Sequence, residues 1–160
     1  MRRTLVAGNW KMNGARAEAC ALVAGLTNGL ANVAGQGDVV ICPPFVLLDV
    51  VAAALAASPV QLGAQNVGAE LSGAFTGEVS AEMLREAACN FVIVGHSERR
   101  ALYGEDNELV ARKFMRSQAA GLTPILCVGE TLEERERDVT QTVIAAQLDA
   151  VLDSAGVDAL

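Results

Sequence analysis

The sequence predicts an α/β fold made of repeated strand–helix units, and three observations support this prediction. Hydrophobic residues make up 52% of the chain and aromatic residues only 4%, a balance that suits buried strands covered by helices better than an aromatic-rich β-sandwich. Short apolar runs alternate with segments of helical period. The unit recurs about every 30 residues, the length that a parallel βαβ crossover requires. A length of 160 residues fits a single domain.

Five apolar runs are short enough to be strands and are apolar on both faces, as the strands of a parallel sheet are. They are Thr4–Ala7, Val39–Cys42, Val60–Ala64, Phe91–Val94 and Pro124–Val128. The predicted helices are Ala15–Leu30, Phe45–Ala57, Ser80–Ala88, Asn107–Ala120 and Leu132–Ser154. Capping signals agree with these helices, since Ser80 precedes a helix whose first turn is acidic and Gly121 follows another as a C-cap.

Repeated βα units fit two architectures, an open doubly wound sheet and a closed eight-stranded barrel, and periodicity cannot choose between them. The turn after the first strand reads GNWKMNG. It contains neither the G-x-G-x-x-G of a dinucleotide fold nor the phosphate-binding pattern of a P-loop. The longest irregular stretch, Gln65–Gly77, is rich in glycine, and a loop of that length inside a compact unit usually has a function.

Charge and composition argue against several classes of protein. The formal net charge is −7, and no basic cluster could follow a nucleic-acid backbone. The N-terminal residues are too poor in apolar side chains for a signal peptide, and no run approaches a membrane span, so we expect a cytoplasmic protein without a membrane partner. The four cysteines are widely spaced and the chain has one histidine. We therefore expect no zinc site and reduced, mostly buried thiols.

Polar side chains follow four of the five predicted strands, at the edge where parallel α/β folds bind their ligands. Amide, ammonium, imidazole and carboxylate groups gathered on one rim could polarise a carbonyl and stabilise an oxyanion. In chain order they are Asn9, Lys11, Gln65, Asn66, His96, Glu98 and Glu130.

Several residues at this rim also have a plainer interpretation. Lys11 alone is typical of a solvated surface lysine, and His96 alone is typical of a hydrogen-bonded structural residue. The run Glu98–Arg100 could be a solvated face or could form ion pairs that tie a loop to the rim. Cys127 could pair with His96 as a nucleophile, but it is more typical of a small core residue. Glu130 fits a supporting partner better than a base.

Taken together, four motifs resemble the triosephosphate isomerase family in order and spacing. They are GNWKMN, GAQNVGAELSGAFTGEVS, VIVGHSERR and PILCVGETLEERE, and the resemblance covers the whole chain. It implies a TIM (β/α)8 barrel, here an incomplete barrel of about five parallel βα units. It also implies the interconversion of dihydroxyacetone phosphate and D-glyceraldehyde 3-phosphate through an enediolate, in glycolysis and gluconeogenesis. No metal and no organic cofactor are implied.

The resemblance also implies a role for each rim residue. Lys11 would place positive charge beside the carbonyl and phosphate of the substrate, and Asn9 would help to hold the oxygen that becomes anionic. His96 would be a neutral electrophile kept neutral by a helix N-terminus, an effect for which this family is the standard example. The sequence SERRALYG after His96 could form that helix. Glu98 would match the carboxylate that bonds the lysine.

A homodimer is implied as well. In the family the loop that here spans Gln65–Glu78, with Thr76 near its tip, reaches into a neighbouring subunit. It lies there beside the first-strand loop, where Met12 would be enclosed.

The family barrel has eight strands in roughly 250 residues, so we expect residues 1–160 to form one partial domain that stops before the sixth strand. The general-base glutamate, the lid and the glycine-rich phosphate site cannot be assigned here. Strands one and five would keep open edges. Three explanations stay open: part of a longer chain, a piece whose complement lies elsewhere, and a half-barrel rescued by association.

Two functions of different classes follow. The first is an isomerase of which this chain carries the electrophilic half, so that the 160 residues alone are inactive. The second is a non-catalytic fragment or dimerisation module of that enzyme, which lacks the general base. Another sugar-phosphate barrel enzyme is a third, weaker possibility.

Overall fold

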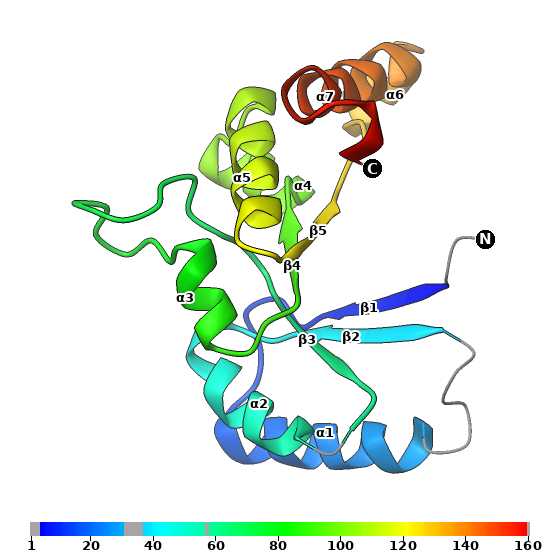
Figure 1. Ribbon diagram of the computed structural model, residues 1–160. Helices are drawn as coiled ribbons and strands as arrows, with labels where there is room; N and C mark the ends of the chain where they lie inside the picture. The colour runs from blue at the N-terminus through cyan, green and yellow to red at the C-terminus, as the bar shows by residue number, and fades with distance from the viewer. Residues whose placement is uncertain (1–3, 31–36, 57, 160) are drawn as a thin grey trace.

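The computed structural model describes residues 4–30, 37–56 and 58–159, and Figure 1 shows strands and helices alternating along them. Five strands form one sheet in the order β1-β2-β3-β4-β5, and every neighbouring pair is parallel. The strands are β1 (Leu5–Asn9), β2 (Asp38–Cys42), β3 (Gln61–Ala64), β4 (Phe91–Val94) and β5 (Thr123–Leu126). This sequential parallel order is that of a barrel segment rather than of a doubly wound sheet, and it confirms the predicted fold class.

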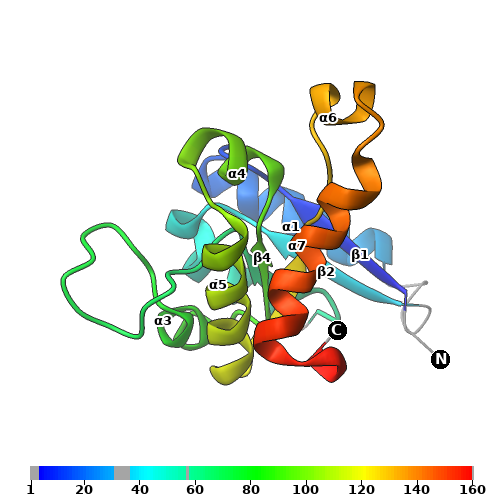
Figure 2. The same ribbon diagram turned by 90° about the horizontal axis from the view of Figure 1, so that it is seen from above.

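The helices lie around the outside of the curved sheet in both views (Figures 1 and 2). They are α1 (Arg16–Leu30), the 3₁₀ turn η1 (Phe45–Leu47), α2 (Leu48–Leu55), α3 (Ala81–Glu86), α4 (Ser97–Tyr103), α5 (Asn107–Ala119), α6 (Leu132–Glu136), α7 (Thr140–Ala155) and the 3₁₀ turn η2 (Val157–Ala159). The main core fills the space between sheet and helices and includes Leu48, Val51, Leu84 and Phe114.

A smaller cluster lies on the other face of the sheet, around Val40, Cys42 and Ile93. Gly63 is required in this layer, because a Cβ atom there would come within 2.7 Å of the Cys42 sulfur. Apolar residues thus cover both faces of the central strands, as the sequence predicts for a parallel sheet. Among the described strands, exposed residues occur only on β1 and β5, at the margins of the sheet.

The two outer strands differ from the central ones. In the described part of the chain β1 pairs only with β2, and β5 pairs only with β4. On β1, Leu5 is 41% exposed and Val6 is 60% exposed. Open edges at the first and fifth strands were expected from the sequence, and the structure has them.

Several predicted boundaries need correction. The helix predicted over Leu132–Ser154 is wrong as a single element, because it is broken between α6 and α7. Asp138 adopts a left-handed backbone conformation at the break (φ 55°), which aspartate tolerates better than most residues. The backbone N–H groups of Asp138 and Val139 close the last turn of α6.

The other differences are smaller. The helix predicted over Phe45–Ala57 begins as η1 and ends at Leu55, and its last predicted residue, Ala57, lies outside the described residues. The first strand is shifted toward its carboxyl end and includes Asn9, whereas β5 ends at Leu126. The Ser80 cap is confirmed, since its Oγ accepts a hydrogen bond from the Met83 N–H at 3.3 Å.

The helices of the described segments include none that is both long enough and apolar enough to cross a membrane. Over the same segments, His, Cys, Asp and Glu side chains form no group of three that could hold a metal ion.

Candidate functional site

The turn after β1 presents Lys11 in an unusual backbone conformation. Its φ angle is 53°, a left-handed value that is uncommon for a long side chain. The Lys11 N–H donates to Oδ1 of Asn9 at 2.9 Å. The Lys11 carbonyl accepts a hydrogen bond from Nε2 of Gln65 at 2.8 Å. Both backbone polar groups of Lys11 are therefore held by side chains from strand ends.

The turn after β4 requires a glycine and ends at the histidine. Gly95 has a φ of 69°, and a Cβ atom there would meet a Val110 methyl at 2.9 Å and the Cys127 carbonyl oxygen at 3.2 Å. Only glycine fits both the conformation and the space. The next residue, His96, is the N-cap of α4. The short helix expected after the histidine is thus present as Ser97–Tyr103.

The cap fixes the tautomer of His96. Its Nδ1 accepts a hydrogen bond from the Glu98 N–H at 3.2 Å. The same Nδ1 lies 3.6 Å from Oε2 of Glu98, a contact that becomes an ion pair only if the imidazole is protonated. The N–H bond is the shorter contact and needs a free lone pair at Nδ1, so we assign the proton to Nε2. His96 is then a neutral ring that can donate from Nε2.

Glu98 joins the two turns. Its Oε1 accepts a hydrogen bond from Nζ of Lys11 at 2.7 Å, and both side chains are about half exposed. This hydrogen bond is the main reason why the pKa of Glu98 lies below its ordinary value, and the charge of Lys11 acts in the same direction. Glu98 is therefore an anion that holds the lysine ammonium beside the imidazole.

These groups open onto one cavity of about 600 Å³. Its lining includes Asn9, Lys11, Gln65, His96 and Glu98, which come from the carboxyl ends of β1, β3 and β4. The structure thus brings together the rim residues that the sequence indicated at these three strand ends. An amide, an ammonium group and a neutral imidazole around one cavity can bind a carbonyl compound and stabilise negative charge on its oxygen.

The remaining predicted residues differ in their positions relative to this cavity. Met12 lines the same cavity but is 94% exposed. Thr76 is exposed in the loop between β3 and α3, which extends away from the body of the molecule in both views (Figures 1 and 2). Glu130, after β5, lies 3.6 Å from Nε of Arg135 and does not line this cavity.

The structure does not favour a cysteine nucleophile. Burial raises the pKa of the Cys42 and Cys89 thiols to about 12, and burial also raises the pKa of Cys127. A thiol with a raised pKa carries little thiolate at neutral pH. Two of the four cysteines are buried, Cys127 is partly buried and Cys20 is exposed, so the expectation of mostly buried thiols holds in part.

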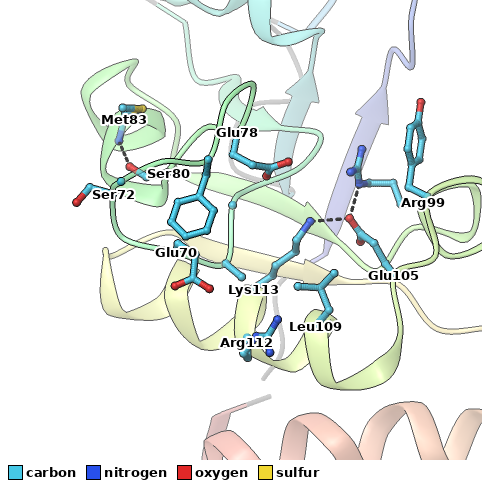
Figure 3. A pocket seen from close by; sticks show the side chains of 15 residues that line it. Glu70, Ser72, Glu78, Ser80, Met83, Arg99, Glu105, Leu109, Arg112 and Lys113 are labelled. Atoms are coloured by element: carbon cyan, nitrogen blue, oxygen red, sulfur yellow. Dashed lines mark hydrogen bonds and ion pairs between the residues drawn. The ribbon is translucent and has the colours of Figure 1, made fainter.

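A second cavity, of about 440 Å³, lies between the long loop and helices α4 and α5 (Figure 3). Its wall contains a buried cluster in which Oε1 of Glu105 accepts hydrogen bonds from Lys113 and, at 2.6 Å, from Arg99. Lys113 also donates to Oδ1 of Asn66 at 2.8 Å. Ion pairing, one of the two interpretations of the Glu98–Arg100 run, is confirmed for Arg99, which bonds Glu105 in the segment between α4 and α5.

Sequence reasoning missed the partners in this cluster. Glu105 and Lys113 are 4% exposed, but eight residues separate them and no sequence pattern distinguishes them from surface charges. The sequence indicates that Gln65 lies on the rim but indicates no role for it. Its position directly after a predicted strand was the only available signal.

The chain resembles proteins of one family. The family model described as triosephosphate isomerase matches residues 4–160. Triosephosphate isomerase of Thiobacillus denitrificans is 57% identical over 160 residues, and that of Alcanivorax borkumensis is 57% identical over 162 residues. These alignments cover 100% and 99% of the chain but 63% of each relative.

A solved structure gives the same result. The crystal structure of triosephosphate isomerase from Bartonella henselae superposes with a TM-score of 0.87 at 38% sequence identity, over 94% of this chain and 62% of that one. The chain thus spans less than two thirds of the length of these relatives.

Proposed function

The chain belongs to the triosephosphate isomerase family, and from this premise we propose that the protein, at the length of its relatives, interconverts dihydroxyacetone phosphate and D-glyceraldehyde 3-phosphate. The observation that carries the proposal is the convergence of Lys11, Glu98 and His96 at one cavity, with Nζ of Lys11 2.7 Å from Glu98. The reaction moves a proton between adjacent carbons and needs no metal or organic cofactor. Its place in metabolism would be glycolysis and gluconeogenesis.

The geometry supports an electrophilic role for these residues. Removing a proton next to a carbonyl creates an enediolate, whose oxygen needs hydrogen-bond donors and positive charge. Nε2 of His96 can donate one hydrogen bond as a neutral group, because Nδ1 is occupied by the Glu98 N–H. Lys11 supplies the positive charge, and the Asn9 amide, which lines the same cavity, supplies a further polar contact.

This half of the site cannot turn over substrate unaided. General-base catalysis contributes roughly 100- to 10,000-fold to a proton transfer. Within the described residues, the lining of the cavity that holds His96 contains two carboxylates, Glu78 and Glu98. Glu98 is engaged by Lys11, and Glu78 lies in the expected dimer loop. We therefore propose that residues 1–160 alone are inactive, and that a non-catalytic fragment is the alternative role of this chain.

The test uses two proteins. One is residues 1–160 alone, and the other is residues 1–160 completed by the remaining C-terminal part of the Thiobacillus denitrificans relative. A coupled assay with glyceraldehyde 3-phosphate should show turnover in the completed protein only. His96→Gln in the completed protein should lower kcat by roughly 100-fold or more, because an oriented donor is lost.

The results separate the two roles. A folded completed protein without activity would overturn the isomerase proposal and favour the non-catalytic role. Robust activity of residues 1–160 alone would contradict the half-site account, since another group would then act as the base.

We also propose a homodimer formed through the Gln65–Glu78 loop. Large apolar side chains are exposed around the cavity and on the loop: Met12 (94%), Phe45 (55%), Phe75 (48%), Leu102 (74%) and Tyr103 (70%). Such a patch favours an interface over open solvent. The loop, with Thr76 near its tip, would close over Met12 of a second copy.

The dimer proposal is tested by the mass of the completed protein in solution, measured by light scattering. Met12→Glu should shift the dimer toward the monomer, because it places a charge at the centre of the interface. Leu132→Glu is the matched control, since Leu132 is 72% exposed on α6, and it should leave the mass unchanged. A monomeric wild-type protein would refute the proposal. A cytoplasmic location is proposed from composition alone and is tested by cell fractionation.

A further inference from the structure

The backbone of Lys11 raises a question that the proposed reaction does not answer. Its ammonium must lie beside Glu98 and the imidazole, yet the residue adopts a φ of 53°. Long side chains adopt this region only where the surroundings enforce it. Asn9 binds the N–H of Lys11, but a single hydrogen bond to the N–H leaves the following peptide free to rotate.

Gln65 supplies the missing constraint. Its Nε2 donates to the Lys11 carbonyl and to the Cys42 carbonyl, each at 2.8 Å. A primary amide has two N–H groups, so both are used. The Cys42 carbonyl also accepts from the Trp10 N–H at 3.1 Å. The Gln65 amide therefore ties the turn after β1 to the end of β2.

The backbone that carries the Gln65 amide is held rigidly. Gln65 directly follows β3, and its own backbone is placed by a central strand that pairs with β2 and β4. The hydrogen bond from Gln65 therefore fixes the Lys11 carbonyl relative to the sheet rather than to the loop. Groups held by strand ends keep their geometry better than groups held by loops.

We propose that Gln65 is a positioning residue for Lys11: its amide holds the Lys11 peptide in the left-handed conformation that brings the ammonium to Glu98 and the cavity. The inference rests on the proposed isomerase function, to which it adds a residue that acts through Lys11 without reacting itself. It distinguishes Gln65 from the other amides near the cavity, because Asn66 binds the buried Lys113 instead.

The first experiment compares Gln65→Met with Gln61→Met in the completed protein. Methionine keeps the length of glutamine but has no donor. Gln61 lies at the other end of β3, where its amide contacts Asp38 at 3.5 Å, so it is a matched control on the same strand. Gln65→Met should lower kcat/KM by roughly 10- to 100-fold, the effect of misplacing a reacting group by about 1 Å. Gln61→Met should retain wild-type kcat/KM.

A double-mutant cycle shows whether Gln65 acts through the lysine. If it does, adding Gln65→Met to Lys11→Met costs little further activity, because the group that it positions is already gone. A merely structural glutamine would lower activity by the same factor in both backgrounds, and that result would overturn the inference. Wild-type kcat/KM in Gln65→Met would overturn it as well.

A crystal structure of Gln65→Met separates this inference from the proposed function. We expect Lys11 to leave the left-handed region and its Nζ to move away from Glu98, whether or not the protein is an isomerase. If the completed wild type is inactive but Lys11 moves in the variant, the proposed function fails while the positional claim stands. If Lys11 keeps its conformation without the amide, the positional claim fails.

Discussion

Glu98 is the residue on which the geometry of the candidate site depends, because one carboxylate meets both the lysine and the imidazole. The hydrogen bond from Lys11 is the main cause of its lowered pKa. A carboxyl group whose pKa is lowered by folding stabilises the fold above its ordinary pKa, near 4.3 for glutamate. That contribution is lost as the pH falls through the lowered value.

The first prediction follows from this cause. Lys11→Met removes the donor and its charge, so the pKa of Glu98 should rise toward the ordinary value. A carbon-13 NMR titration of the glutamate carboxyl groups measures the change. Glu134 is the internal control, because hydrogen bonds from Thr131 lower its pKa and Lys11 contributes nothing there. A Glu98 titration that does not move in the variant would show that Lys11 does not hold the carboxylate.

A second prediction concerns the buried cluster beside the long loop. Burial acts to raise the pKa of Glu105, but hydrogen bonds from Lys113 and Arg99 outweigh it, and the pKa lies below its ordinary value. Glu105→Gln leaves the Lys113 ammonium, 4% exposed, without a counterion. Breaking a buried pair in this way costs about 3–5 kcal/mol.

Urea unfolding at pH 7 should show this loss for Glu105→Gln, and it should show almost none for Glu108→Gln, an exposed glutamate on α5. Because the pKa of Glu105 is lowered, its contribution is complete above about pH 4.3 and fades as the pH falls further. The stability difference between wild type and Glu105→Gln should therefore shrink in acid. A constant difference down to the acid transition would contradict the ion-pair explanation.

At this scale the sequence indicated which side chains lie at the strand ends, but it did not indicate the contacts that hold them. Asn9, Lys11, His96 and Glu98 were found because polar groups directly after apolar strands stand out. The contacts of Gln65 and Glu105 depend on how three strand ends and two helices meet. No local pattern records those distances, so these two residues could be explained only once the fold was known.

At the scale of elements, α7 is joined to the loop after β5 by one buried side chain. Nε2 of Gln147 donates to the Gly129 carbonyl and its Oε1 accepts from the Gly129 N–H, both at 2.9 Å. The glutamine completes the backbone hydrogen bonds of a loop residue as a neighbouring strand would. It also fixes the direction in which the chain leaves β5 toward Glu130.

The third prediction tests this junction. Gln147→Leu should lower the free energy of unfolding by about 1–3 kcal/mol, since it leaves two backbone groups without partners. Hydrogen exchange at the Gly129 amide should accelerate in the same variant. Gln141→Leu, an exposed position on the same helix, serves as the control and should change neither quantity. Unchanged protection of Gly129 would mean that water or another group replaces the glutamine.

The elements themselves were largely predictable from the sequence. Each apolar run became a strand, because fully buried parallel strands need apolar residues on both faces. The break between α6 and α7 was missed because the segment ERERDVT has no glycine or proline, and Asp138 takes the left-handed position that glycine usually marks. The short helix after His96 was expected from the sequence, but the role of His96 as its N-cap was not.

At the scale of the whole molecule, the sheet has two free margins, and their exposure has consequences for solution behaviour. β1 and β5 each lack a second neighbour in the described chain, and β1 carries exposed Leu5 and Val6. An edge strand with unpaired N–H and C=O groups beside apolar side chains is a template for association. The family barrel would cover both margins with its remaining strands.

The last prediction is that Val6→Lys has different effects in residues 1–160 alone and in the completed protein. In residues 1–160 alone, Val6→Lys should reduce association, because a charged side chain on an edge strand opposes pairing with another chain. In the completed protein the same lysine would lie on an interior strand of the closed barrel and should lower the melting temperature. Light scattering over a range of concentrations and thermal unfolding measure the two effects. If Val6→Lys does not change the association of residues 1–160, the β1 margin is not the contact. Val128→Lys then tests the opposite margin, because Val128 follows β5 and is 39% exposed.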